Sequence, residues 1–189
     1  MPWRARSVSA DQQQYRPRDR RAMKRVLSYT FALLLVAPPA FAAGLIPAQI
    51  GRDIHEHGAG ATVHSLDRNG KFDKVLDRIA SGNVAWVRLA PGLARGTDAG
   101  DSTGLTIALA RALPRNPAAV LAALDEGPVI GPEAVCGVPF IEPSSKEIRE
   151  YLDVAIPAVT RIEPSVRVPH RSSCVDALHR VQEQTSRQP

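Results

Sequence analysis

Two acids and three histidines between residues 53 and 64 form the richest group of potential metal ligands in the chain. They are Asp53, His55, Glu56, His57 and His64. Neutral imidazole and carboxylate groups are natural ligands of Zn²⁺. A metal held here could activate water, so the segment offers the chemistry of a metal-assisted hydrolase.

The spacing of these residues argues against a shared metal ion. On one helix His55 and His57 would point about 200° apart. The H-E-x-x-H pattern, which places two histidines on one helix face, does not occur in the sequence. His57 and His64 could share a face, but the glycines between them, Gly58 and Gly60, are expected to break such a helix. We favour an exposed helix end with His57 in its last turn and Gly58 as its C-cap.

Two hydroxyls near the end of the chain, Ser172 and Ser173, lie beside His170 and could include a nucleophile. No pair of base and orienting group is recognisable around them, so we predict that one serine is the N-cap of the last helix.

The residues 58–60 resemble the start of a dinucleotide-binding loop but lack a preceding strand and the third glycine. We therefore predict no cofactor and favour a protein that is not an enzyme.

A polar, glycine-rich segment spans residues 96–104. Its oxygen-bearing side chains suit calcium, but the acids do not have the EF-hand spacing. We expect Asp98 and either Asp101 or Ser102 to cap helix ends.

The connector 138–143 is rigid and partly apolar. It could serve as an exposed recognition edge. We expect instead that Phe140 and Ile141 pack within the domain.

Cys136 and Cys174 are the only cysteines, so one intramolecular disulfide can form. In an oxidising compartment such a bond persists, and it would tie a short helix at Cys136 to the last helix. The alternative is a pair of buried free thiols. Neither cysteine belongs to a C-x-x-C motif, so a redox-enzyme role has little support.

Hydrophobic residues recur at the helical spacing in six segments. These segments are residues 72–79, 86–93, 105–113, 120–124, 148–159 and 175–181. No segment shows a convincing alternation of period two. The pattern predicts an all-α fold, a single compact domain of antiparallel helical hairpins.

Residue types at the ends of these segments also indicate helices. We expect an N-cap at Asn116, a capping box from Ser144 to Glu147, a helix end at Gly82 and a helix start at residues 131–133. Pro91 and Pro157 lie inside helical patterns and are expected to kink or split them.

The pattern of hydrophobic residues in residues 76–90 recurs in residues 110–124, at an offset of 34 residues. Stacked helical hairpins repeat near this length, which points to a HEAT-like or TPR-like arrangement. An irregular bundle with helix pairs of ordinary size would give the same offset, so both architectures stay open.

Residues 23–42 have the features of an export signal. A short basic stretch precedes an apolar run over residues 26–37, and small residues fit cleavage between Ala42 and Ala43. The run is shorter than the roughly 20 residues that span a bilayer. Residues 1–22 are polar and rich in Arg and Gln. We interpret them as a disordered leader that results from a start codon assigned too far upstream.

The net charge of +5 comes from this leader. Residues 1–43 hold eight Lys or Arg and two acids, which leaves 16 bases and 17 acids in residues 44–189, a balance of −1. The bases of residues 44–189 are scattered, so the sequence gives no electrostatic footprint for nucleic acid.

Several short sequence motifs resemble those of other proteins, and together they cover nearly the whole exported part of the chain. They are residues 55–59, 79–83 with Trp86, 96–100, 112–117 with Val120 and Leu121, and 135–136 with 139–142. From about Leu45 to Val181 the chain resembles small secreted helical proteins of Gram-negative bacteria that have no known activity. The resemblance implies export and one helical domain, and it supplies no catalytic residue.

The sequence thus predicts a disordered leader over residues 1–22, a signal peptide over 23–42, a helical domain over 43–184 and a disordered tail over 185–189. We expect a periplasmic or secreted protein that binds another protein, as accessory subunits, inhibitors and immunity factors do. We expect it to bind no nucleic acid and, after signal cleavage, no membrane. The alternative is a metal-assisted hydrolase that uses His55, His57 and His64.

Overall fold

Hydrophobic residues at helical spacing produce helices throughout the part of the chain that the computed structural model describes, residues 44–163 and 168–187. No strand occurs in those ranges, so the predicted all-α fold is confirmed. All of these residues belong to one compact unit. The leader 1–22, the signal segment 23–42 and the cleavage site between Ala42 and Ala43 lie outside the described residues.

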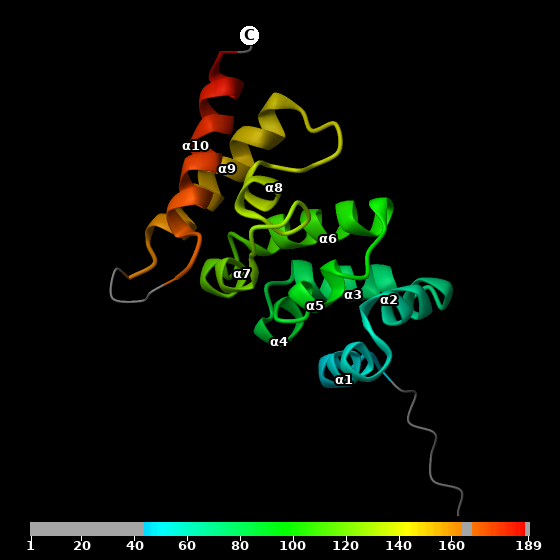
Figure 1. Cartoon of the computed structure of the whole chain (residues 1–189). Coiled ribbons are helices and arrows are strands. Elements are labelled where there is room, and N and C mark those ends of the chain that lie inside the picture. Colours follow the sequence, from blue (N-terminus) through cyan, green and yellow to red (C-terminus); the bar gives the residue numbers. More distant parts are fainter. Residues whose placement is uncertain (1–43, 164–167, 188–189) are drawn as a thin grey trace, which may run out of the picture. The chain divides into compact units, whose positions relative to one another are not determined.

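The helices are labelled in chain order in Figure 1. They are α1 (Pro47–His57), α2 (Ala59–Arg68), α3 (Phe72–Ala80), α4 (Val84–Val87), α5 (Ala90–Ala94), α6 (Ala99–Ala112), α7 (Pro117–Ala123), α8 (Pro132–Cys136), α9 (Ser145–Thr160) and α10 (Arg171–Ser186). Among these described helices, none is long and apolar enough to cross a membrane.

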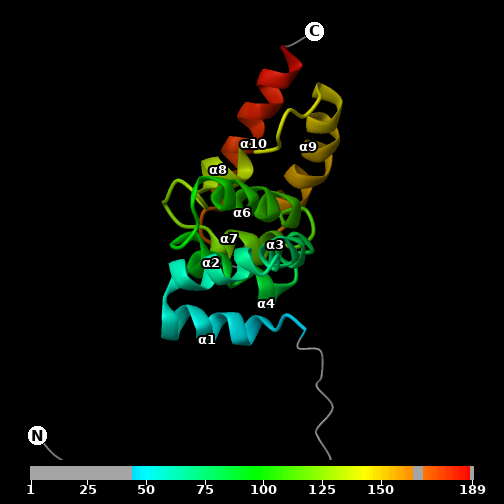
Figure 2. The same ribbon diagram turned by 90° about the vertical axis from the view of Figure 1, so that its right-hand side faces the viewer.

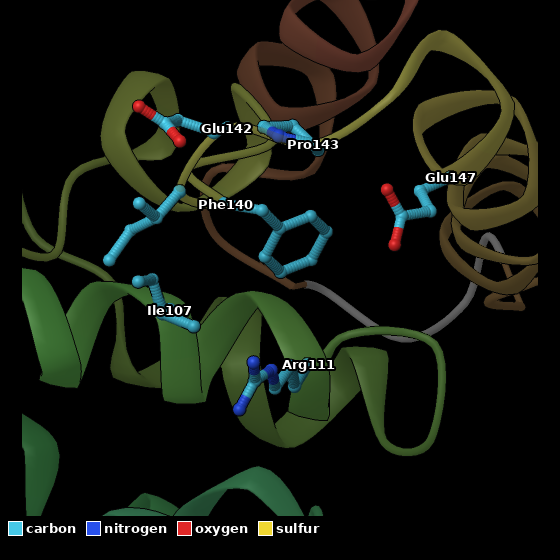
Figure 3. A pocket seen from close by; sticks show the side chains of 7 residues that line it. Ile107, Arg111, Phe140, Glu142, Pro143 and Glu147 are labelled. Atoms are coloured by element: carbon cyan, nitrogen blue, oxygen red, sulfur yellow. The ribbon is translucent and has the colours of Figure 1, made fainter.

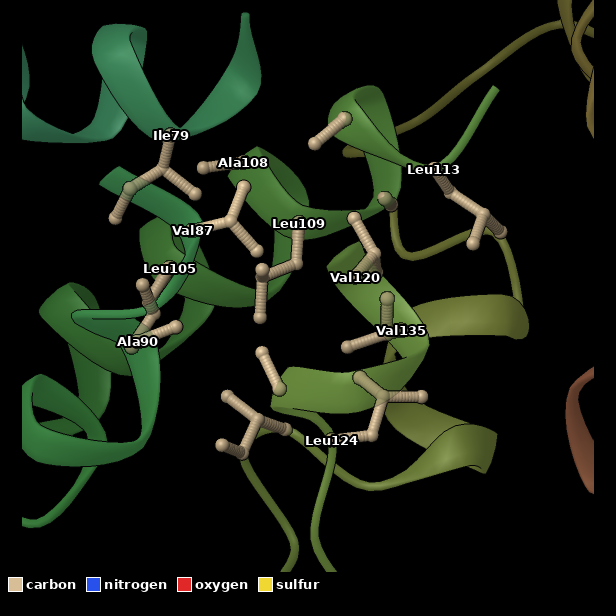
Figure 4. Close-up of a cluster of buried hydrophobic side chains, with 14 of the residues drawn as sticks. Ile79, Val87, Ala90, Leu105, Ala108, Leu109, Leu113, Val120, Leu124 and Val135 are labelled. Carbon is tan, nitrogen blue, oxygen red and sulfur yellow. The ribbon is translucent and has the colours of Figure 1, made fainter. Parts of the chain in front are cut away.

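The hydrophobic core lies around α6. This helix runs beside α3 and also contacts α5, α7 and α8. Leu105 and Leu109 of α6 are fully buried and pack with side chains from α3, α4 and α7 (Figure 4). Gly104 lets α3 and α6 approach closely, because a Cβ atom there would lie 2.7 Å from Leu76 Cδ1.

The hydrophobic pattern that recurs after 34 residues corresponds to two adjacent units, α3 with α4 and α6 with α7. Helix α3 packs on α6, and α4 packs on α7. Asn116 Nδ2 donates a hydrogen bond of 2.9 Å to the Gly82 carbonyl, and Arg115 Nη1 donates one of 2.7 Å to the Ala80 carbonyl. The turns of the two units are thus joined directly. A repeat array needs about three units, so this pair alone does not define a HEAT-like or TPR-like array.

The helix ends follow the predicted caps. Asn116 Oδ1 accepts a hydrogen bond from the Ala119 amide at 3.2 Å. Ser144 and Glu147 form the complete capping box, in which each side chain accepts from the other residue's amide. Gly82 has a φ of 77°, in the left-handed region that favours glycine, and it separates α3 from α4.

The two prolines inside helical patterns behave differently. Pro91 stands in the first turn of α5, where its missing amide hydrogen is not needed, so the pattern over residues 86–93 is split into α4 and α5. Helix α9 continues across Pro157 to Thr160, so of the two expected effects, a kink or a split, the split does not occur.

The start of α10 corrects a further prediction. The N-cap is His170, whose φ of 58° is left-handed, whereas Ser172 and Ser173 lie within the first turn. Because the chain already turns at His170, the first helical hydrogen bond runs from the Cys174 amide to the His170 carbonyl. At its other end α10 extends to Ser186, two residues past the domain boundary drawn from the sequence.

Candidate functional site

The histidine-rich segment is divided between two helices. His55 and His57 lie in α1, His64 lies in α2, and Gly58 ends α1 with a φ of 86°. Gly58 is therefore the C-cap, as predicted, while Gly60 lies inside α2 and does not break it. All three histidines are exposed, and the residues that the structure describes contain no group of three ligands placed to hold a metal ion.

The serines of α10 do not form a catalytic pair. Ser172 and Ser173 are exposed, and over residues 44–163 and 168–187 no hydrogen bond joins either of them to His170. His170 Nδ1 instead lies 3.3 Å from the Glu126 carboxylate. The structure thus brings His170 to the carboxylate of Glu126.

The polar segment 96–104 supplies one of the two expected caps, Asp98 at the start of α6. The expectation that Asp101 or Ser102 also caps a helix end is wrong, because α6 has already begun at Ala99 and both residues lie inside it. Asp98 Oδ1 accepts hydrogen bonds from the Gly100 and Asp101 amides at 3.0 and 3.2 Å. Burial and the nearby carboxylates of Asp98, Asp67 and Asp73 raise the pKa of Asp101 above its usual value. Acids from α2, α3 and α6 therefore gather at the start of α6.

The predicted disulfide is present. Cys136 at the end of α8 and Cys174 in the first turns of α10 are bonded, with their Cα atoms 5.3 Å apart, and both residues are fully buried. An ion pair between Glu133 and Arg180 joins the same two helices at the surface. Helix α10 also packs against α9, so the bond fixes the last two long helices onto the core (Figure 2).

Two adjacent hollows open along α6, and we call them together the α6 groove. The first has a volume of about 360 Å³ and is lined by Ile107, Arg111, Phe140, Ile141, Glu142, Pro143 and Glu147. The second has a volume of about 280 Å³ and is lined by Asp73, Leu76, Asp77, Ala80, Gly104, Ile107, Ala108 and Arg111. The shared residues Ile107 and Arg111 separate the two hollows.

The first hollow is apolar at its centre and charged at its margins. Phe140 lies in the middle, with Ile107 and Arg111 projecting from α6 and Glu142 and Glu147 on other sides (Figure 3). The connector that carries Phe140 packs on Tyr151 of α9. The Phe140 ring meets the Tyr151 ring edge-on, with 4.9 Å between the centroids.

Tyr151 links the connector to the core. Its hydroxyl donates a hydrogen bond of 2.9 Å to the Ala110 carbonyl in α6, and burial raises the pKa of this hydroxyl above its usual value. The wall formed by Phe140 is therefore anchored to α6 through a buried aromatic pair.

The connector 138–143, which the sequence offered as a possible exposed recognition edge, corrects the preferred expectation that both of its large apolar residues pack within the domain. Phe140 is half-buried, as expected, but Ile141 is 76% exposed and does not pack within the domain. Glu142 has a φ of 46° and Val138 a φ of 58°. Residues other than glycine rarely adopt such values. The only sequence signal was the apolar run beside prolines in residues 138–143.

Known proteins offer no guide to this geometry. No family model, curated protein or solved structure matches the chain. Any function must therefore be argued from the side chains that the fold brings together.

Proposed function

We propose that this protein is exported and acts by binding another protein, as an accessory subunit or an inhibitor would. We also propose that the chain is related to the small secreted helical proteins of Gram-negative bacteria whose short sequence motifs it resembles. Export is supported by the signal pattern in residues 23–42 and by the Cys136–Cys174 disulfide, since such bonds persist in oxidising compartments.

The observation that carries the binding role is the exposed isoleucine on the margin of the α6 groove. Ile141 is 76% exposed, the largest exposed fraction among the large hydrophobic residues described. A single exposed apolar side chain is ordinary on a protein surface. Here it stands beside Phe140, Pro143 and Ile107, so apolar side chains from the connector and from α6 meet at one hollow of the surface.

This apolar group is also held in a fixed position. The edge-on Phe140–Tyr151 pair and the hydrogen bond from Tyr151 to the Ala110 carbonyl attach it to α6. Anchoring of this kind lowers the ordering cost that a partner must overcome on binding. The α6 groove therefore offers a pre-organised surface.

Site-specific photocrosslinking from the groove tests the proposal. The chain is produced with a photoreactive phenylalanine analogue at position 141, in the bacterium that encodes it. We expect irradiation to yield one dominant crosslinked protein. The matched control places the analogue at Val154, which is 53% exposed on α9 and lies outside the groove.

The outcome at the two positions decides the matter. A protein captured from position 141 and not from position 154 supports the binding role. No crosslinked protein from position 141, or the same set of proteins from both positions, contradicts it.

A further inference from the structure

We infer that the α6 groove takes a segment of the partner that presents apolar side chains flanked by Lys or Arg. This inference rests on the proposed binding role and specifies the chemistry of what is bound. It is carried by the charges around the groove together with the apolar centre.

The lining of the groove is predominantly acidic. Four carboxylates border it, those of Asp73, Asp77, Glu142 and Glu147, whereas Arg111 is the single cation in its lining. Within residues 44–163 and 168–187, none of these five side chains takes part in an ion pair. Glu147 Oε2 is occupied by the capping box with Ser144, so the carboxylates of Asp73, Asp77 and Glu142 are the ones most open to a partner.

The acidic border continues along α6 beyond the second hollow. Asp101 stands three residues before Gly104 and shares its helix face. Burial, and after it the nearby carboxylates of Asp98, Asp67 and Asp73, raise the pKa of Asp101. Carboxylates gathered in this way create a negative potential that a cationic segment would relieve.

Other cations of this region lie outside the lining of the groove. Arg115 keeps its positive charge, and its Nη1 atom donates to the carbonyls of Ala80 and Arg111. Lys71, Lys74 and Arg78 line a different hollow, which they share with Asp77. In the lining of the α6 groove itself, Arg111 is the one cation beside four carboxylates.

The shape suits side chains of a protein segment. The two hollows, of about 360 and 280 Å³, fall near the lower end of small-ligand pockets, about 300–1,000 Å³. They lie in a row on either side of Ile107 and Arg111, so two successive apolar side chains of one segment could enter them. Lys or Arg on the margins would then meet the carboxylates.

Peptides of defined charge test the inference directly. We use three labelled helical peptides of about 18 residues, or five turns, with the same apolar stripe and with Lys, Gln or Glu at the flanking positions. The purified full chain is titrated into each, and fluorescence anisotropy gives the Kd. We expect the Lys peptide to bind about tenfold more tightly than the Glu peptide, from a few exposed charge contacts. The difference should shrink at about 1 M salt, where the Debye length is about 3 Å.

Charge variants locate the effect. The triple variant Asp73→Asn, Asp77→Asn, Glu142→Gln should remove most of the preference for Lys. The matched control, Glu150→Gln with Asp153→Asn and Glu183→Gln, neutralises exposed acids outside the groove lining and should keep the preference. Circular dichroism and the count of free thiols confirm that each variant has folded.

The inference and the proposed function fail separately. Equal binding of the three peptides, no binding by any of them, or equal effects of both triple variants overturns the inference. So does a segment crosslinked at position 141 whose acids outnumber its Lys and Arg by mass spectrometry. In each of these cases the proposed binding role still stands if position 141 captures a dominant protein. Without such a capture that role itself is lost.

Discussion

Replacing Cys136 and Cys174 together by alanine is expected to lower the free energy of unfolding by about 4 kcal/mol. The bond closes a loop across 38 positions of the sequence. Without it the unfolded chain gains the entropy of that loop, while the folded state loses the link between α8 and α10. A domain of this size is typically stable by about 5–15 kcal/mol, so the loss is a large fraction of its stability.

Urea unfolding followed by circular dichroism measures this change. The double variant should unfold at a clearly lower urea concentration than the parent protein, and dithiothreitol should affect the parent protein alone. The control Arg180→Gln removes the surface ion pair with Glu133 between the same helices, and it should cost less than about 1 kcal/mol. A loss below that limit in the double cysteine variant would mean that the disulfide contributes little.

The substitution Gly96→Ala is expected to cost about 3 kcal/mol, the upper end of the usual range for overpacking. A Cβ atom at Gly96 would lie 2.3 Å from the carbonyl carbon of Ala59 and 2.4 Å from its oxygen. These are backbone atoms at the start of α2, so no side-chain rotation can relieve the clash. The turn before α6 must move away from α2.

Two other glycines provide matched controls for Gly96→Ala. A Cβ atom at Gly60 meets nothing within 4 Å, and one at Gly100 meets only Asp98 Oδ1 at 3.7 Å. Both positions are helical, so alanine there should be neutral or should stabilise the protein by up to about 1 kcal/mol. Thermal unfolding of the three variants gives the comparison. If Gly96→Ala melts with the two controls, the close approach of the two backbones is wrong.

Local sequence patterns predicted the fold because its determinants are local. The periodic stripe that includes Leu105 and Leu109 needs only the helical repeat to be recognised, and α6 carries it. The caps at Asn116 and Ser144 likewise depend on residues within one helical turn. With two cysteines the pairing had one solution, so the disulfide was predictable once an oxidising compartment was assumed.

The α6 groove was not predictable in this way because it is made by distant segments. Its walls come from α3, α6, the connector 138–143 and the start of α9, and no local pattern specifies their contact. Ile141 is exposed directly before Glu142, whose backbone is left-handed, a conformation that glutamate does not signal in a sequence. The same difficulty explains the start of α10, where a left-handed residue is His170 instead of glycine.

The mass of the exported protein, measured before and after reduction, is the most direct test of the central claim. The chain is expressed in a Gram-negative host, recovered from the periplasm and treated with an alkylating reagent. We predict a chain that begins at Ala43 and takes up no alkyl group until it is reduced, after which Cys136 and Cys174 both react. A chain found in the cytosol with residues 1–42 still attached and both thiols alkylated without reduction would contradict an exported, disulfide-linked helical protein.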